Sequence, residues 1–458
     1  MNNNKFDVCI IGAGVAGGTL AAYLGASGKK VMVIEKMMGE SDKIIGELLQ
    51  PGGVEMLHNM NLQHLIEGID AQIVTGYGLF YKEERIQVSY PTKEGKVFTG
   101  RGFRYGKFIS SIRKNLKSIP NVTVVEGNVI ELIEAEGKVI GVKYIDKHSD
   151  EEIFVEAYLT IACDGSGSLF RKKLSDAAQT VSSHFLGLEV KNENLPYHGH
   201  GHVMLLDPSP CLCYPISSEV CRVLIDFPTT VAPRKSEELV TYLKEKIAPQ
   251  FPEEIRQNLL MAIDEGKFKI MPASLVPARP KLIKGAILLG DSFNMRHPLT
   301  GGGMTVALTD VYTITNLIKN IDLTNDQILT SAIKEFYEKH HYNNASINIL
   351  ADALYGVMLD PQLKQACFEY LKRGNGYAAE PITLLSAISR KRSTLLKHFF
   401  SVAFFGVNDN LKYPTPSNVG KAFNMIKNAL QILNPLMLNE QPGVVVKSAL
   451  KVTEAILK

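Results

Sequence analysis

A run of 21 residues near the N-terminus, residues 8–28, contains six glycines and no charged side chain. The run is long enough to span a bilayer, but Gly12, Gly14 and Gly17 form the pattern G-x-G-x-x-G, and a second apolar run follows at residues 30–34. This arrangement predicts a nucleotide-binding unit of strand, glycine turn, helix and strand. A signal peptide is not expected, because no basic segment precedes the run and no cleavage site follows it.

Each residue of this unit has a physical role. Gly12 permits a tight turn, Gly14 lets the backbone approach a pyrophosphate, and Gly17 lets the helix pack closely on the sheet. The helix N-terminus offers free N–H groups to phosphate. Glu35, at the end of the second strand, can accept hydrogen bonds from ribose hydroxyls. The pattern alone does not distinguish NAD from FAD.

Two later segments also place a Gly/Asp turn between an apolar strand and an expected helix. Residues 158–171 end a strand at Asp164, and a helix is expected to follow at once. Residues 286–310 place Asp291 after another apolar run, and three glycines precede the next helix: Gly301, Gly302 and Gly303. A single Asp of this kind is most simply a helix N-cap. Three such units in one chain favour contacts to a bound nucleotide.

The overall composition excludes several other classes of protein. Hydrophobic residues make up 45% and charged residues 21% of the 458 residues, which indicates a globular chain. Lys+Arg is 50 and Asp+Glu is 47, a net charge of +3, so no nucleic-acid partner is expected. The six cysteines lack metal-ligand spacing. We therefore expect reduced, buried thiols and no metal site.

The C-terminal part is helical in pattern and basic in charge. From Lys391 onward, nine Lys or Arg residues stand against three acidic residues, a net charge of +6. Residues 419–433 place apolar side chains on one helical face: Val419, Phe423, Ile426, Leu430 and Leu433. Such a helix either lies in a membrane interface or packs on a core or a second copy. The basic balance favours an anionic membrane surface.

Taken together, the motifs resemble flavoprotein monooxygenases of the para-hydroxybenzoate hydroxylase fold, and among them most closely the squalene epoxidase (squalene monooxygenase) family. The resemblance covers nearly the whole chain, and its most specific part is the 21-residue block LLGDSFNMRHPLTGGGMTVAL at 288–308. Three residues depart from the family pattern: Lys36 and Lys43 stand where Arg is expected, and Ser292 where Ala is usual. We expect no N-terminal hydrophobic extension of the kind that some members carry. The other matching segments are GELLQPGG (46–53), DAQIVTGYGL (70–79), ACDGSGSLFRK (162–172), PSPCLCYPISS (208–218), MPASLVP (271–277), NILADALY (348–355) and HFFSVAFFGV (398–407).

The resemblance implies an α/β fold with a Rossmann-like FAD-binding domain, an inserted β-rich substrate domain and a C-terminal helical region associated with a membrane. The expected boundaries are 1–175 and 276–330 for the FAD-binding domain, 176–275 for the substrate domain and 331–458 for the helical region.

The resemblance also implies which residues hold the cofactor, FAD. For Arg113 the sequence alone shows only an amphipathic helix and favours a solvated side chain; the family match places it at FAD. Tyr77 and Gln50 resemble the pair that lines the family's pocket near the flavin, although a Tyr packed in the core is the simpler alternative for Tyr77. Phe80, Phe293, Pro298 and Leu299 are further pocket candidates. The expected cofactor residues are Gly12, Gly14, Val15, Ala16, Gly17, Glu35, Lys36, Lys43, Leu48, Arg113, Val129, Asp164, Asp291, Gly301, Gly302, Gly303 and Met304.

The activity that the resemblance implies is the epoxidation of squalene to (S)-2,3-oxidosqualene in sterol biosynthesis. Reduced flavin and O2 give a flavin hydroperoxide, whose distal oxygen adds to the alkene. An alkene has no proton to abstract, so no catalytic triad or carboxylate pair is needed, and an apolar tunnel is expected.

Several partners and a location follow from the same resemblance. Electrons are expected from a separate NADPH–cytochrome reductase, because no second nucleotide fingerprint is found. The expected location is the cytosolic face of the endoplasmic reticulum, with peripheral or monotopic attachment through the C-terminal helices, and lipid droplets are a second location. Two alternatives stay open: an FAD-dependent isoprenoid reductase, and a non-catalytic lipid-escort protein that keeps the FAD fold.

Overall fold

The computed structural model describes residues 5–44, 46–93 and 95–440. The glycine-rich start forms the predicted unit: β1 lies on β2 in parallel, and α1 (Val15–Ala26) connects them. The parallel sheet runs in the order β10, β2, β1, β12 and β18, and β11 pairs antiparallel with the outer parts of β10 and β12. Its strands are β1 (Phe6–Ile11), β2 (Val31–Glu35), β10 (Val122–Ala135), β11 (Lys138–Asp146), β12 (Glu152–Ala162) and β18 (Ala286–Leu288).

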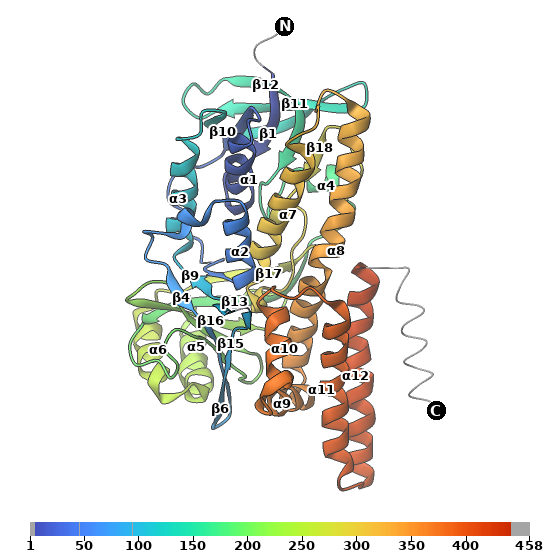
Figure 1. Cartoon of the computed structure of the whole chain (residues 1–458). Coiled ribbons are helices and arrows are strands. Elements are labelled where there is room, and N and C mark those ends of the chain that lie inside the picture. The colour runs from blue at the N-terminus through green and yellow to red at the C-terminus, as the bar shows by residue number, and fades with distance from the viewer. Residues whose placement is uncertain (1–4, 45, 94, 441–458) are drawn as a thin grey trace, which may run out of the picture.

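Helices from distant parts of the chain cover this sheet. α1 packs against α3 and α7, and α7 also contacts α2 and α8 (Figure 1). The helices α1 and α7 carry few charges and bury most of their residues, because both lie between the sheet and further helices. The bounds are α2 (Pro51–Asn59), α3 (Tyr105–Leu116), α7 (Gly303–Ile318) and α8 (Asp326–Leu359).

A second, seven-stranded sheet lies beside the first, with α5 (Glu237–Tyr242) and α6 (Glu253–Glu265) packed on it (Figure 1). Its pairings are antiparallel except between β14 and β5, which are parallel. β5 and β6 precede residue 175, so the segment expected to form the FAD-binding domain also contributes to this sheet. The strand order is β17 (Lys269–Leu275), β13 (Thr180–Lys191), β16 (Val220–Phe227), β15 (Cys211–Pro215), β14 (Gly201–Met204), β5 (Gly76–Tyr81) and β6 (Glu84–Ser89).

Small elements join the two large sheets. A three-stranded sheet connects residues before and after β5 and β6, in the order β3 (Leu48–Leu49), β9 (Gly100–Gly102) and β4 (Gln72–Val74). A two-stranded hairpin, β7 (Thr92–Lys93) and β8 (Lys96–Val97), follows β6. The short helix α4 (Arg171–Leu174) follows β12.

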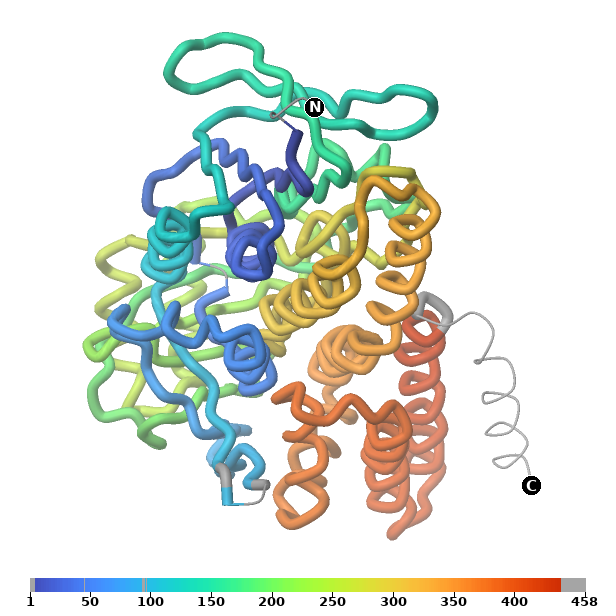
Figure 2. Tube along the Cα trace, turned by 45° about the horizontal axis from the view of Figure 1, so that its top comes forward, coloured from blue at the N-terminus to red at the C-terminus, as the bar shows by residue number. Residues whose placement is uncertain are grey.

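The C-terminal helices form a bundle below α8 (Figures 1 and 2). α11 and α12 lie side by side as a hairpin, α11 also packs on α9, and α12 also packs on α8. In the described part of the chain, no helix is both long and apolar enough to cross a membrane. The bounds are α9 (Pro361–Lys372), α10 (Asn375–Leu385), α11 (Arg392–Leu411) and α12 (Pro416–Glu440).

Candidate active site

Three loops meet where the parallel strands β1, β12 and β18 end, as the motif spacing predicts. We call this place the loop edge; it consists of residues 12–14, 163–170 and 290–303. Gly12 has φ +99°, and a Cβ there would lie 2.6 Å from the Cys163 carbonyl oxygen. A Cβ on Gly17 would lie 2.0 Å from the Gly12 oxygen. Only glycine fits at these two positions, because backbone packs directly on backbone.

Gly14 differs from its two neighbours in the motif. A Cβ on Gly14 would meet only the Tyr105 hydroxyl, at 3.9 Å, so the space beside this residue is open. The first turn of α1 follows at Val15 and Ala16, and its N-terminal N–H groups have no side-chain cap. Open space beside uncapped N–H groups suits a bound phosphate.

The Glu35 carboxylate holds the glycine loop from the end of β2. One oxygen accepts the Ala13 N–H at 2.6 Å and the other accepts the Met37 N–H at 3.0 Å. Arg113 lies 3.3 Å from Glu35 and donates to the carbonyl oxygens of Ala13 at 3.2 Å and Gly39 at 2.8 Å. Arg113 is therefore buried at the loop edge, and the solvated side chain that its helical pattern alone favours is wrong.

Asp164 and Asp291 are not helix caps. α4 begins only at Arg171, later than expected, because the Asp164 carboxylate accepts the Leu169 N–H at 2.9 Å and closes a loop over residues 164–170. The other Asp164 oxygen is buried and has no hydrogen-bond partner within the described residues. Burial raises the pKa of Asp164.

The Asp291 side chain reaches solvent, yet the surrounding protein raises its pKa by desolvation, against the opposing charges of Arg296, Lys43 and Arg171. A carboxylate in such a recess is suited to hydroxyl groups of a ligand. Together with the unpaired oxygen of Asp164, it leaves acceptor capacity at the loop edge for hydroxyl groups of a ligand.

Arg171 connects two of the three loops, and the sequence did not single it out as a functional residue. Its guanidinium donates to the carbonyl oxygens of Ser166 at 2.7 Å, Ser292 at 2.9 Å and Asp291 at 3.1 Å. The Ser292 hydroxyl donates to the Ala162 carbonyl at 2.7 Å. This bond ties the third loop to the end of β12.

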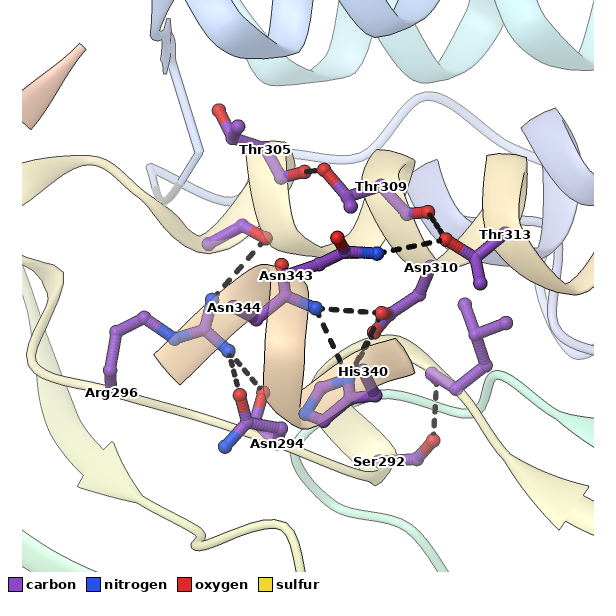
Figure 3. A network of polar contacts seen from close by, with 12 residues as sticks. Ser292, Asn294, Arg296, Thr305, Thr309, Asp310, Thr313, His340, Asn343 and Asn344 are labelled. Carbon is purple, nitrogen blue, oxygen red and sulfur yellow. Dashed lines mark hydrogen bonds and ion pairs between the residues drawn. The ribbon is translucent and has the colours of Figure 1, made fainter. Parts of the chain in front are cut away.

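A buried polar network supports the loop of residues 301–303 (Figure 3). On α7, Asp310 accepts from Asn344 of α8 at 2.8 Å and lies 2.9 Å from Nδ1 of His340. Arg296 reaches the Gly303 carbonyl at 3.5 Å and donates to the Asn294 carbonyl at 2.8 Å. These contacts fix the start of α7, and with it the loop of residues 301–303.

The remaining expected cofactor residues are spread more widely. Met304 and Tyr105 lie near each other, since a Cβ on Gly46 would be 3.6 Å from the Met304 sulfur and 3.5 Å from the Tyr105 ring. Burial and the charges of Asp291 and Glu35 raise the pKa of Tyr105 to about 12. Sequence reasoning missed Tyr105, which follows no motif.

Exposure differs among the last four expected cofactor residues: Lys36, Lys43, Leu48 and Val129. Lys36 and Lys43 are exposed, while Leu48 is buried. Val129 is 5% exposed and packs in the core near Tyr144. β10 meets the end of β2 at Glu126, opposite Glu35, where a hollow is lined by Met38 and Val125.

An apolar cavity, partly open to solvent, lies between the second sheet and the C-terminal helices. Of the four further pocket candidates, Leu299 lines this cavity. Phe293 packs against His340, and Phe80 against His202. The lining side chains are almost all apolar: Tyr77, Leu79, Val88, Val203, Leu205, Leu299, Leu350, Ala353, Leu354, Val357, Met358, Leu363, Cys367, Tyr370, Leu371, Ala378, Pro381, Ile382, Leu384, Leu385, Leu395, His398, Phe399, Val402 and Ala429.

Gln50 and Tyr77 meet where the cavity approaches the loop of residues 301–303. The Gln50 amide donates to the Tyr77 hydroxyl at 2.5 Å and to the Thr300 carbonyl at 2.7 Å, and it accepts from the Tyr90 hydroxyl at 2.8 Å. Gly301 lies directly above, where a Cβ would be 3.2 Å from the Gln50 nitrogen. Burial raises the pKa of both tyrosines, so both stay protonated at neutral pH. Tyr90 was not anticipated.

A nucleotide-binding βαβ unit whose loop edge lies beside a second, largely antiparallel sheet is the architecture of flavoprotein monooxygenases. Solved structures of flavin-binding proteins are similar to the chain. A flavoprotein/dehydrogenase from Cytophaga hutchinsonii has a TM-score of 0.69 and 17% identity, covering 88% of this chain and 100% of that chain. HpxO of Klebsiella pneumoniae, solved with FAD, has a TM-score of 0.66 and 17% identity, covering 83% and 99%. These likenesses confirm the predicted fold.

Sequence comparison then identifies the family within this class. Residues 156–423 match the squalene epoxidase family model. Squalene epoxidase 1 of Arabidopsis thaliana is 42% identical over 444 residues, covering 95% of this chain and 83% of the relative. The squalene monooxygenase of Mus musculus is 39% identical, covering 95% and 78%. The chain belongs to the squalene epoxidase family, as its motifs predicted.

Proposed function

We propose that this protein is an FAD-dependent monooxygenase that converts squalene to 2,3-oxidosqualene, using O2 and electrons from a separate NADPH–cytochrome reductase. The observation that carries the proposal is the apolar cavity lined by Tyr77, whose hydroxyl accepts from Gln50 beside the loop of residues 301–303. A hydrocarbon offers no group for polar recognition, so an almost entirely apolar wall suits it. Family membership supports the same substrate.

The residues at the loop edge fit FAD. Gly14 and the start of α1 are suited to the pyrophosphate, Glu35 and Arg113 to the adenosine end, and Asp291 to the hydroxyls of the ribityl chain. Bound there, FAD would supply reducing equivalents and an electrophilic oxygen derived from O2.

The chain's own residues would align the substrate and exclude water. Addition of oxygen to an alkene releases no proton, so the site needs no general base. Tyr77 and Tyr90 keep their protons because burial raises the pKa of both hydroxyls. Gln50 fixes the Tyr77 hydroxyl at the wall of the cavity, and the apolar side chains along its length hold the hydrocarbon.

The α11–α12 hairpin supports attachment to a membrane surface. Of the predicted apolar face of α12, Phe423 is 69% and Val419 48% exposed, whereas Leu433 is 3% exposed and packs inward. The helix thus packs on the protein through a face that includes Ala422, Met425 and Leu433, and near its start it presents apolar side chains to solvent, as do Tyr413 and Leu411 just before it. Part of the basic charge noted above, at Lys447, Lys451 and Lys458, lies outside the described residues. We propose that this tip lies on the endoplasmic reticulum surface.

Product analysis tests the reaction. Detergent-purified protein with squalene, FAD, NADPH, O2 and a partner reductase should form 2,3-oxidosqualene, detected by mass spectrometry, and the product should vanish without O2. A saturated product would instead indicate an isoprenoid reductase. A colourless protein that takes up no FAD would indicate an escort protein. Flavin reduction by NADPH at catalytic rates without any reductase would contradict the proposal that a separate reductase supplies the electrons.

Vesicle flotation tests the membrane surface. Phe423→Asp should lower binding to vesicles that contain phosphatidylserine, because it places a charge in the apolar tip. The control is Phe154→Asp, since Phe154 is also exposed (45%) but lies on β12, at the opposite end of the molecule (Figure 1). Equal binding of the two variants would contradict the assignment of the tip.

A further inference from the structure

A second buried polar cluster lies between the seven-stranded sheet and the loop of residues 290–303. The proposed reaction does not use it. Its five side chains come from β13, from β16, from α8, from the segment that precedes β15 and from the segment that precedes residues 301–303. Each is at most 8% exposed. They are Ser183, Ser209, Asp226, His297 and Tyr355.

The hydrogen bonds of His297 define a direction through this cluster. Nδ1 accepts the Leu299 N–H at 3.3 Å, so in the neutral ring the hydrogen is on Nε2, which lies 3.1 Å from the Ser183 hydroxyl oxygen. Burial lowers the pKa of His297 to about 3, which keeps the ring neutral. His297 therefore donates to Ser183, and this bond ties the imidazole to β13.

Asp226 belongs to the same cluster and holds Tyr355. Its Oδ2 accepts from the Tyr355 hydroxyl at 2.9 Å and from the Ser209 hydroxyl, and its buried Oδ1 has no hydrogen-bond partner among the described residues. The pKa of Asp226 is raised by burial, and hydrogen bonds from hydroxyl groups oppose that shift. A carboxylate that receives several O–H donors is a strong anchor in a buried site.

The anchored imidazole fixes the turn that follows it. The His297 ring stacks on Tyr355, with centroids 3.6 Å apart and planes 13° apart, and its backbone N–H donates to Asp352 at 2.9 Å. Three residues later, the Thr300 carbonyl accepts from Gln50 at 2.7 Å, and Gln50 donates to Tyr77. A continuous path thus connects Asp226 to Tyr77 at the wall of the cavity.

We infer that Ser183 and His297 are positioning residues that hold the Thr300 carbonyl where it orients the Gln50 amide, and that they thereby set the direction of the Tyr77 hydroxyl. This inference rests on the proposed function. If the turn shifts, Gln50 loses an acceptor that keeps its nitrogen toward Tyr77. The amide is then free to rotate, and oxygen that fails to reach the alkene leaves as hydrogen peroxide.

Ser183→Ala tests the inference, with Ser182→Ala as the matched control. Ser182 is the preceding residue of β13, and its hydroxyl donates to the Ala273 carbonyl at 3.0 Å, away from the cluster. We expect Ser183→Ala to lower kcat for epoxide formation about tenfold, the loss of roughly one buried hydrogen bond, and to raise the hydrogen peroxide formed per NADPH. KM for squalene and FAD content should stay within about twofold, since neither site loses a contact. Ser182→Ala should behave as wild type.

A double-mutant cycle separates positioning from general destabilisation. If Ser183 acts through Gln50, then Ser183→Ala should have no further effect on kcat or on peroxide formation in a Gln50→Ala background. Additive effects would overturn the inference. Tyr355→Phe, which keeps the stacked ring and removes one donor to Asp226, serves as the second variant if Ser183→Ala does not fold, and the same non-additivity is expected.

A readout that needs no turnover distinguishes this inference from the proposed function. ¹⁵N spectra of histidine-labelled protein, assigned with His297→Gln, should show the Nε2–H form of His297 from pH 5.5 to 8, and Ser183→Ala should shift that signal. A protonated or Nδ1–H ring would overturn the inference. Wild-type protein that shows this form but makes no epoxide would contradict the proposed function, whereas epoxide formation with additive effects would contradict the inference alone.

Discussion

The loop edge and the apolar cavity meet at Gln50, but they are built in opposite ways. The loop edge is made of backbone: Gly12 packs on the Cys163 carbonyl, and Arg171 is bonded to carbonyl oxygens of two loops. The cavity is made of side chains from the second sheet, the turn at Leu299 and the helices α8 to α12, with few polar groups. A backbone site tolerates no change of shape, whereas an apolar wall of many side chains tolerates small ones.

The difference predicts unequal sensitivity to mutation. A single methyl group at the loop edge meets fixed backbone atoms, which have no rotamers through which to yield. A single methylene removed from the cavity wall changes one of many weak contacts. The following substitutions test this contrast, beginning with the largest expected effect.

Gly12→Ala should abolish FAD binding and lower the melting temperature. The new Cβ would lie 2.6 Å from the Cys163 oxygen, and φ is +99°, so the loop must move. Gly28→Ala is the control, because Gly28 has φ +91° with nothing within 4 Å. It should cost only the backbone penalty of about 1 kcal/mol and keep FAD. Flavin absorbance and thermal unfolding measure both, and a flavin-replete Gly12→Ala variant would contradict the backbone description.

Asp291→Ala should lose FAD while the chain stays folded. The carboxylate faces solvent and makes no side-chain hydrogen bond within the described structure, so the fold does not depend on it. Loss of charge-assisted bonds to the cofactor predicts a Kd about 10 to 100 times higher. Titration of apoprotein with FAD measures this, and Asp291→Asn should fall between Asp291→Ala and wild type. Unchanged flavin content in Asp291→Ala would remove Asp291 from the cofactor assignment.

The sequence predicted the loop edge well because its determinants are local. A glycine turn after an apolar strand needs only neighbouring residues to be recognised, and the three turns at Gly12, Asp164 and Asp291 all lie where such strands end. The sequence did not reveal Arg171 or Tyr105, because their roles depend on distant partners. Arg171 bonds to Ser292, about 120 residues away, and Tyr105 lies near the charge of Asp291, about 190 residues away. A single chain carries no local signal for such pairings.

The cavity and the helical tail show the same limit from the other side. The period of α12 predicted an apolar face but not which part of it would be covered: Leu433 packs inward, whereas Phe423 stays exposed. Likewise, β5 and β6 join the second sheet through the parallel pairing of Tyr77 with Gly201. Strand pairing over more than 100 residues is set by the whole fold, and no turn signal announces it.

Tyr77→Phe tests the point where the two regions meet. The variant keeps the ring and removes the hydroxyl to which Gln50 donates at 2.5 Å. Losing one neutral hydrogen bond predicts a fall in turnover of about 3- to 10-fold, with flavin content unchanged. Tyr81→Phe is the control on the same strand, since its ring packs on Phe368. Steady-state kinetics decide, and unchanged turnover would return Tyr77 to an ordinary packed residue.

Leu79→Val should have the smallest effect, and it is confined to substrate binding. Leu79 lines the cavity on β5, two residues beyond Tyr77, and the change removes one methylene from the wall. At about 0.8 kcal/mol per buried methylene, KM for squalene should rise about fourfold. The value of kcat and the flavin content should not change, because the wall contacts ground state and transition state alike. A fall in kcat as large as that of Tyr77→Phe would mean that the cavity wall is as strictly shaped as the loop edge, and the contrast between the two regions would be lost.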